Sequence, residues 1–278
     1  LACREGRDVF PDDKELLFRQ AMLEHHLGRS QDAVATYRRV LTGTSGRHFS
    51  SMDAGLDGFK ARHNLALVFE ELEDLDSAAA EWLQITQEQP NYLPAQRGLI
   101  DAWFQLGKIA ELEEQSSQLR LQTDDSKSSL GWYCEGRIAE LRRDIDGALI
   151  AFDMADRMDT RDTSALRHIC RLMFESGRWS QARSQLERLC ERAVDDASTY
   201  CNLGVAYSHV GETDLAVAAF WRSLELRPDS PETWVRLGQI LQDNGREVEA
   251  AECWKQVEMN SSPDSRCCGV LSGSTQVR

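Results

Sequence analysis

Residues 197–230 and residues 231–264 carry one pattern of large and small side chains, offset by 34 positions. The first copy has Tyr200, Leu203, Gly204, Tyr207, Gly211, Ala216, Phe220 and Pro228, and the second has Trp234, Leu237, Gly238, Leu241, Gly245, Ala250 and Trp254 at the matching places, with Pro263 one place late. A period of this length describes one supersecondary unit that buries its apolar face against the next unit. The central glycine suits a turn between two helices, and the proline ends the second helix because it cannot continue it. The pattern therefore predicts a stack of helical hairpins.

An aromatic residue followed by Leu-Gly, a second large residue, and then Ala, an aromatic residue and Pro resembles the tetratricopeptide repeat. The resemblance implies an all-α fold, a right-handed α-solenoid of about seven helix-turn-helix repeats. Counting frames gives repeats at 14–47, 59–92, 93–126, 129–162, 163–196, 197–230 and 231–264, of which the third is degenerate. Residues 48–58 form an insertion of 11 residues between the first two repeats.

We also make predictions for the segments that lie outside the regular 34-residue repeats. We expect residues 1–13 to be the remnant of a preceding repeat, so that the chain starts inside a longer array. The polar run 123–129 adds two residues to the period, and we expect the array to bend or flex there. The tail, 265–278, is rich in Ser and Gly and is predicted to be disordered.

The formal net charge of −14, from 46 acidic and 32 basic residues, argues against nonspecific binding to nucleic acid, which needs a basic face. It also argues against docking on anionic lipid. No apolar run reaches the roughly 18 residues of a transmembrane helix, and the first residues lack the apolar core of a signal peptide. The eight cysteines form no Cys-x-x-Cys pair. We therefore expect buried, reduced thiols and a cytoplasmic location.

The chain shows no motif of a known catalytic or cofactor site. Phosphate-binding, dinucleotide-binding, metalloprotease and serine-hydrolase patterns are all missing from the sequence. We therefore predict that this chain is not an enzyme and that it binds no cofactor and no metal.

The tetratricopeptide resemblance also implies which residues face a ligand. In this family the second, fifth, sixth and ninth positions of each first helix line a concave groove. The bases at these positions are Arg19, Lys60, Arg97, Arg137, Arg167, Arg171 and Arg236. The acids are Glu15, Asp101 and Glu232, and His63 and Asn64 occupy the fifth and sixth positions of the second repeat. Because bases outnumber acids there, we expect a basic groove that attracts an acidic partner.

Four of the groove residues resemble the carboxylate clamp of chaperone-binding tetratricopeptide domains, which captures the C-terminal carboxylate of a peptide. Asn202 and Arg236 match the clamp in residue type, whereas Arg167 replaces a Lys and Arg171 replaces an Asn. A further clamp Lys is replaced by an acid, Glu232, which reverses a charge. Arginine still suits bidentate contacts with carboxylate or phosphate. The leading hypothesis is thus a noncatalytic protein-interaction scaffold that binds an extended peptide or an acidic partner in its groove.

A second resemblance concerns the parent protein. The phrases at 58–66 and 89–95 are similar to the tetratricopeptide segments that trail bacterial family-2 glycosyltransferases. This implies an alternative function, an accessory region that positions the acceptor for a catalytic domain outside this chain. Oligomerisation through repeat stacking is a third possibility, because no obvious capping helix follows Asp264.

Overall fold

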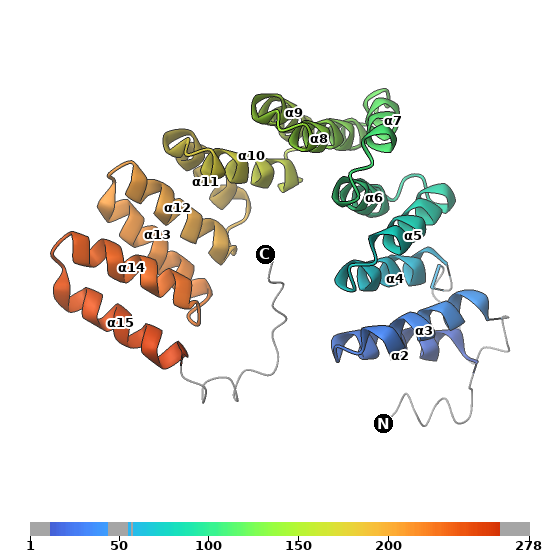
Figure 1. The fold of residues 1–278 in the computed structure, drawn as a ribbon, viewed down its shortest axis with the longest axis horizontal. Coiled ribbons are helices and arrows are strands. Elements are labelled where there is room, and N and C mark those ends of the chain that lie inside the picture. The colour runs from blue at the N-terminus through green and yellow to red at the C-terminus, as the bar shows by residue number, and fades with distance from the viewer. Residues whose placement is uncertain (1–11, 44–54, 57, 262–278) are drawn as a thin grey trace. The chain divides into compact units, whose positions relative to one another are not determined.

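The computed structural model describes residues 12–43, 55–56 and 58–261. In these residues it contains fourteen α-helices and no strand, in the order that the sequence frame predicts (Figure 1). They follow one another as seven pairs: α2 (Lys14–His26) with α3 (Ser30–Thr42), α4 (Phe59–Glu71) with α5 (Leu75–Glu88), α6 (Leu93–Gln105) with α7 (Ile109–Arg120), α8 (Asp125–Leu141) with α9 (Ile145–Met158), α10 (Ser164–Glu175) with α11 (Trp179–Arg192), α12 (Ala197–His209) with α13 (Thr213–Leu226), and α14 (Pro231–Asp243) with α15 (Glu247–Ser261).

The chain divides into two compact units, residues 1–151 and residues 152–278. In the first unit, one buried cluster runs from α2 to α6 and includes Tyr37, Leu65, Trp82 and Leu99. In the second unit, buried clusters join α10 to α13 and α12 to α15, with Phe220 at 2% exposure between α13 and the next pair. Within these clusters, each pair therefore buries its apolar side chains against its neighbours, as a repeat architecture requires.

The turn between the two helices of each pair has the same backbone conformation in all seven pairs. The residue at this place has a positive φ, and it is Gly28, Glu73, Gly107, Arg143, Gly177, Gly211 or Gly245. Glycine adopts this left-handed conformation without the steric cost that a side chain brings. Glu73 and Arg143 adopt it with φ of 59°, so the fold holds the turn even where the sequence lacks glycine.

The fourth pair begins earlier than the sequence frame places it. The frame starts this repeat at Ser129, but α8 begins at Asp125, where the Asp124 carboxylate caps the helix by accepting from the Lys127 amide at 3.0 Å. Ser128 and Ser129 are both buried in this first turn. Residues 125–129 are therefore helical, and most of the polar run lies in a helix and not in a connecting segment.

Three of the sequence predictions concern residues outside the described part of the chain. These are the remnant repeat up to residue 11, most of the insertion at 48–58, and the tail at 265–278. Among the helices that the structure describes, none combines the length and the apolar character needed to cross a membrane.

Candidate functional site

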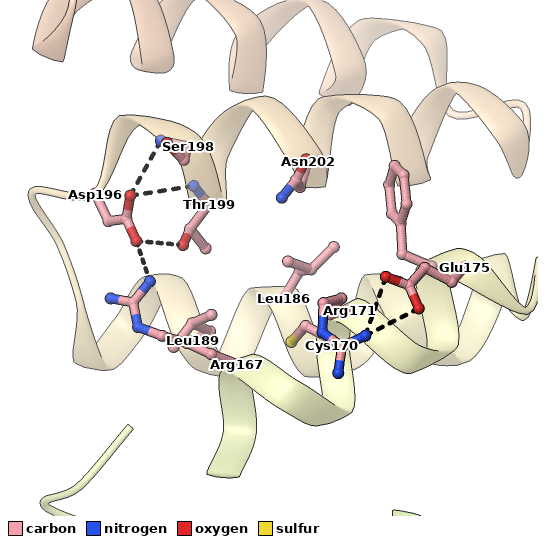
Figure 2. Close-up of a pocket in the computed structure, with 11 residues that line it drawn as sticks. Arg167, Cys170, Arg171, Glu175, Leu186, Leu189, Asp196, Ser198, Thr199 and Asn202 are labelled. Atoms are coloured by element: carbon pink, nitrogen blue, oxygen red, sulfur yellow. Dashed lines mark hydrogen bonds and ion pairs between the residues drawn. The ribbon is translucent and has the colours of Figure 1, made fainter. Parts of the chain in front are cut away.

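A pocket of about 220 Å³ lies between α10 and α12 in the second unit, above part of α11 (Figure 2). Three residues singled out from the sequence, Arg167, Arg171 and Asn202, line it together. The remaining lining residues are Cys170, Phe174, Glu175, Leu186, Leu189, Asp196, Ser198 and Thr199. The repeat register explains the grouping, because α10 and α12 are the first helices of consecutive pairs.

The pocket has an apolar floor and a polar rim. Cys170, Leu186 and Leu189 are all less than 6% exposed, and they form the floor with Phe174. Arginine, carboxylate, hydroxyl and amide groups surround the floor. A concave site with an apolar base and a few polar groups is the usual form of a ligand pocket.

Arg167 and Asp196 form an ion pair across the pocket, from α10 to the start of α12. Asp196 also caps α12, since its carboxylate accepts from the Ser198 amide at 3.1 Å and the Thr199 hydroxyl at 2.8 Å. Burial alone would raise the pKa of Asp196, but the hydrogen bonds from Arg167 and Thr199 and the charge of Arg167 outweigh it and lower the pKa. The result is an ionised carboxylate that fixes Arg167 at the rim.

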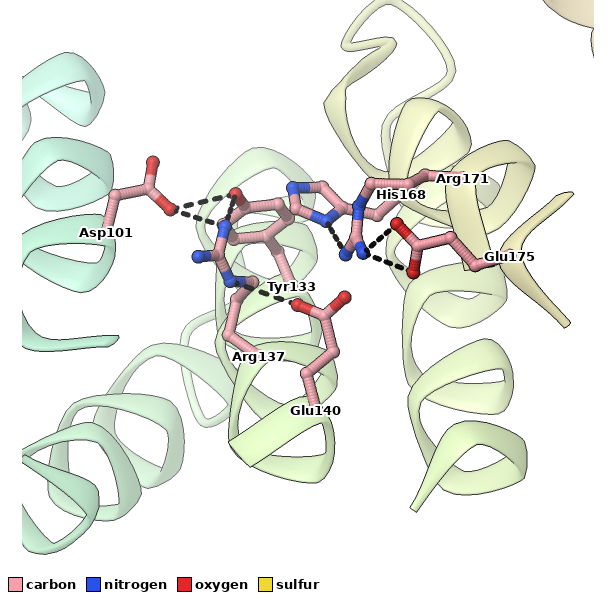
Figure 3. A network of polar contacts seen from close by, with 7 residues as sticks. All are labelled: Asp101, Tyr133, Arg137, Glu140, His168, Arg171 and Glu175. Carbon is pink, nitrogen blue, oxygen red and sulfur yellow. Dashed lines mark hydrogen bonds and ion pairs between the residues drawn. The ribbon is translucent and has the colours of Figure 1, made fainter. Parts of the chain in front are cut away.

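Arg171 is held within its own helix. Its Nη1 lies 3.0 and 3.1 Å from the two carboxylate oxygens of Glu175, one turn further along α10. Its Nη2 lies 3.2 Å from Nδ1 of His168, and Figure 3 shows both contacts of the guanidinium. His168 in turn stacks on Phe152, with ring centroids 4.9 Å apart. The contacts with Glu175 and His168 position the guanidinium, which remains 45% exposed.

Unlike Arg167 and Arg171, Asn202 has a side chain that forms no hydrogen bond with a charged neighbour in the described part of the chain. It is exposed on α12, and its amide has no hydrogen-bond partner among the residues that the structure describes. Figure 2 shows the amide pointing toward the space above Leu186. A carboxamide offers both a donor and an acceptor, which is the complement of a peptide backbone.

Arg236 does not join this pocket. It pairs with Glu232 at 2.8 Å within α14, and it lines a second pocket of about 280 Å³ between α12 and α14. The other residues of that lining are Val205, Ser208, His209, Phe220, Val235, Gln239, Ile240 and Asp243. The four residues of the predicted clamp are thus divided three to one between two pockets.

In the first unit, Arg137 is buried inside a polar network on α8 (Figure 3). Its guanidinium contacts Asp101 at 2.9 Å and Glu140 at 3.2 Å, and it lies 3.6 Å above the ring of Phe104. The Tyr133 hydroxyl donates to Asp101 at 3.0 Å. With only 11% of its side chain exposed, Arg137 connects α6 to α8 and offers little surface to a partner.

Four other predicted residues of the first unit, Lys60, His63, Asn64 and Arg97, are half-buried, whereas Arg19 on α2 is exposed. Arg97 lies 4.8 Å above the Tyr133 ring, and Lys60 lies on α4. His63 packs edge-on against Trp82 and Tyr92, and burial lowers its pKa. Asn64 lies against the Tyr37 hydroxyl, whose pKa is raised to about 12, mainly by burial. His63 and Asn64 therefore take part in packing between neighbouring helices.

Acidic residues outside the counted groove positions offset much of the predicted positive charge. Arg137, Arg167 and Arg171 meet Glu140, Asp196 and Glu175, none of which lies at a counted position. Arg19 and Arg236 meet Glu15 and Glu232 one turn away. The local charge is therefore closer to balance than the sequence count implies. An Asp directly before a helix is a known capping signal. The sequence could therefore have predicted that Asp196 places a carboxylate at the start of α12.

Family models match two segments of the chain, residues 3–48 and residues 197–230, and both describe the tetratricopeptide repeat. The chain contains tetratricopeptide repeats. Together with the seven helix pairs, these matches confirm the predicted fold class, an all-α solenoid of such repeats. The predicted likeness to repeats that trail glycosyltransferases stays a prediction.

Solved structures give the same fold at low sequence identity. A tetratricopeptide repeat protein from Parabacteroides merdae is 16% identical, with 86% of this chain and 90% of that chain covered and a TM-score of 0.58. A structure of MamA AMB-1 is 14% identical, with coverage of 63% and 96% and a TM-score of 0.51. No curated protein matches the chain in sequence.

Proposed function

We propose that this chain is a noncatalytic protein-interaction scaffold, and that the pocket between α10 and α12 binds an extended peptide. The observation that carries the proposal is the arrangement of Arg167, Arg171 and Asn202 around one apolar floor. Stacked repeats create such surfaces by placing equivalent helix faces side by side. The tetratricopeptide fold adds support, since its repeats commonly bind proteins.

Two features of the pocket favour a peptide. The floor is apolar and suits one aliphatic or aromatic side chain, whose burial stabilises a complex by roughly 1.5–3 kcal/mol. The Asn202 amide, exposed beside the floor, suits the N–H and C=O groups of the same peptide residue. A peptide that buries one side chain in the floor and pairs its backbone with Asn202 fits both features.

The arginines favour a carboxylate next to that apolar residue, either an acidic side chain or a C-terminus. A guanidinium has five N–H donors, and Arg167 donates to Asp196 through Nη1. A ligand carboxylate can therefore bind the other edge of the guanidinium while Asp196 keeps its place. The free thiols of Cys134, Cys170, Cys190, Cys201 and Cys253 suit a reducing, cytoplasmic compartment.

Selection of peptides from a phage-displayed random library on the full chain tests the proposal. We expect the selected peptides to contain an apolar residue next to a carboxylate. We expect them to bind the Asn202→Ala and Arg171→Ala variants at least tenfold more weakly than the wild type. Arg222→Ala is the matched control, because Arg222 on α13 is 42% exposed, has a similar local ion pair with Glu225, and lines neither of the two pockets described. Selected peptides that bind all variants equally, or a selection that yields none, would overturn it.

A further inference from the structure

The pocket between α10 and α12 and the pocket between α12 and α14 share one helix. α12 contributes Ser198, Thr199 and Asn202 to the first pocket. It contributes Val205, Ser208 and His209 to the second. The two cavities are therefore successive sites on the same surface, one toward each neighbouring first helix.

The second pocket repeats the chemistry of the first. Val205, Phe220 and Ile240 are less than 9% exposed and form an apolar floor. Arg236 stands at the rim and is paired with Glu232 one turn away, as Arg171 is paired with Glu175. Each rim arginine has a carboxylate of its own helix beside it, and Asp243 adds another carboxylate to the lining of the second pocket, so neither opening has an excess of positive charge. The floors of both pockets suit apolar side chains.

Helix geometry gives the distance between the two pockets. The midpoints of the two contributions from α12 are separated by about seven residues, or about 10 Å along the helix axis at 1.5 Å per residue. Adjacent helices in proteins lie about 8–10 Å apart, and we take this spacing as the sideways displacement from one pocket to the next. The floors are therefore about 14 Å apart, the length of roughly four residues of extended chain at 3.3 Å each.

We propose that the two pockets bind two apolar residues of one extended peptide, at positions i and i+4. This inference rests on the proposed function of the first pocket and adds the spacing of the ligand motif. In an extended chain, residues i, i+2 and i+4 point to the same side, so both anchors face the protein while alternate residues face solvent. Asn202, which also lines the small polar pocket between the N-terminal ends of α12 and α14, lies where the peptide backbone crosses α12.

A set of synthetic peptides tests the spacing. Each peptide has an Asp-Leu pair in a Ser and Thr background, with either no second leucine or a second leucine two, three, four, five or six places from the first, on either side. Fluorescence anisotropy with the full chain measures Kd. The i, i+4 peptide is expected to bind about tenfold more tightly than the single-leucine peptide, because only it fills both floors without strain.

A pair of variants assigns the second anchor to its pocket. Val235→Ser removes an apolar group from the second pocket at a residue that is 41% exposed, so the fold tolerates it. The control is Val248→Ser, since Val248 on α15 is 86% exposed and lines neither pocket. Val235→Ser is expected to remove the tenfold gain and to leave the single-leucine peptide unaffected, whereas Val248→Ser is expected to change neither.

The outcomes separate the two proposals. If the single-leucine peptide binds in a way that depends on Asn202, but the spacing of the second leucine has no effect, the inference fails and the proposed function survives. A Val235→Ser variant that keeps the full gain also overturns the inference. If no peptide of the set binds, both the spacing and the peptide-binding function are wrong.

Discussion

Gly204 in α12 lies directly against the ring of Phe220 in α13: a Cβ added to Gly204 would be 2.7 Å from Cε1 of Phe220. The same relationship recurs in the next pair, where a Cβ on Gly238 would lie 3.0 Å from the Trp254 ring. A glycine in the first helix thus lets an aromatic ring of the second helix pack on bare backbone. This close approach is the physical reason for the Leu-Gly and aromatic positions of the repeat pattern.

We expect Gly204→Ala to destabilise the second unit, because the overpacking costs about 1–3 kcal/mol and exceeds the helix-propensity gain of about 1 kcal/mol. In a Phe220→Leu background the ring is gone, and Gly204→Ala should become neutral or stabilising. Urea denaturation of the wild type, both single variants and the double variant measures this coupling. Equal effects of Gly204→Ala in the two backgrounds would contradict the packing described.

Glu73 and Arg143 occupy turn positions at which the other five pairs have glycine. A side chain in the left-handed region costs about 1–2 kcal/mol, whereas glycine costs about 0.5–1 kcal/mol in chain entropy. Glu73→Gly is therefore expected to raise the free energy of unfolding by about 0.5–1 kcal/mol. Ala80→Gly, at an exposed site inside α5 of the same pair, should lower it by about 1 kcal/mol. A destabilising Glu73→Gly would count against the strained turn.

The period of the sequence was sufficient to predict the helix pairs. It also grouped Arg167 and Arg171 with Asn202, but it placed Arg236 with them, and Arg236 lines a different pocket. Helical register places Arg167 and Arg171 one turn apart, and the 34-residue offset places Asn202 on the equivalent face of the next pair. The ion pairs were not predictable in the same way. Glu175 and Asp196 lie outside the groove positions, and their contacts depend on side-chain rotamers and on a capping interaction that a repeat frame does not describe.

The start of α8 shows a second limit of the frame. A strict 34-residue count begins the fourth repeat at Ser129, but the Asp124 cap and the burial of Ser128 extend the helix toward the N-terminus. The Asp124 cap and the small size of serine thus make this segment helical, although its composition is typical of linkers.

Arg137, predicted to be a groove residue, is also placed differently from the prediction. It is enclosed by Asp101 and Phe104 of α6 and by Glu140 of its own helix.

Arg137 is expected to matter for stability more than for binding. Arg137→Ala removes the guanidinium beside Asp101 and beside Glu140, 7% of whose side chain is exposed, and loss of one partner of a buried pair costs about 3–5 kcal/mol. The control is Arg142→Ala near the end of α8, because Arg142 and its partner Glu113 are both about half exposed and such pairs contribute about 0–1 kcal/mol. Thermal denaturation that shows equal losses for the two variants would disprove the buried role.

The cysteines should differ in reactivity. Burial, with the charges of Glu135 and Asp101, raises the pKa of the Cys134 thiol to about 12, and the thiolate is the reactive form. Burial also raises the pKa of Cys201, but this thiol is only partly buried and lines the small polar pocket beside Asn202, where the reagent can reach it. In native protein at pH 8, iodoacetamide should label Cys201 at least tenfold faster than Cys134, and the difference should disappear in urea. Peptide mapping by mass spectrometry measures both rates, and rapid native labelling of Cys134 would refute its burial.

Asp196 combines two roles that substitutions can separate. Asp196→Ala removes both the α12 cap and the partner of Arg167, and we expect a loss of about 1–2 kcal/mol at pH 7. Asp196→Asn keeps a capping side chain and loses only the charge. Since the pair is partly exposed, this loss should be about 0.5 kcal/mol. Urea denaturation at neutral pH distinguishes the two variants.

The pH dependence of stability isolates the charge of Asp196. Because its pKa in the folded protein lies below the ordinary value, the unfolded state binds the proton more readily. The stabilisation is therefore complete above the unfolded pKa and is lost as pH falls through the folded pKa. The difference in unfolding free energy between wild type and Asp196→Asn should shrink as pH falls below about 4. A difference that stays constant from pH 7 to pH 3 would mean that Arg167 and Asp196 do not interact as a charged pair in the folded protein.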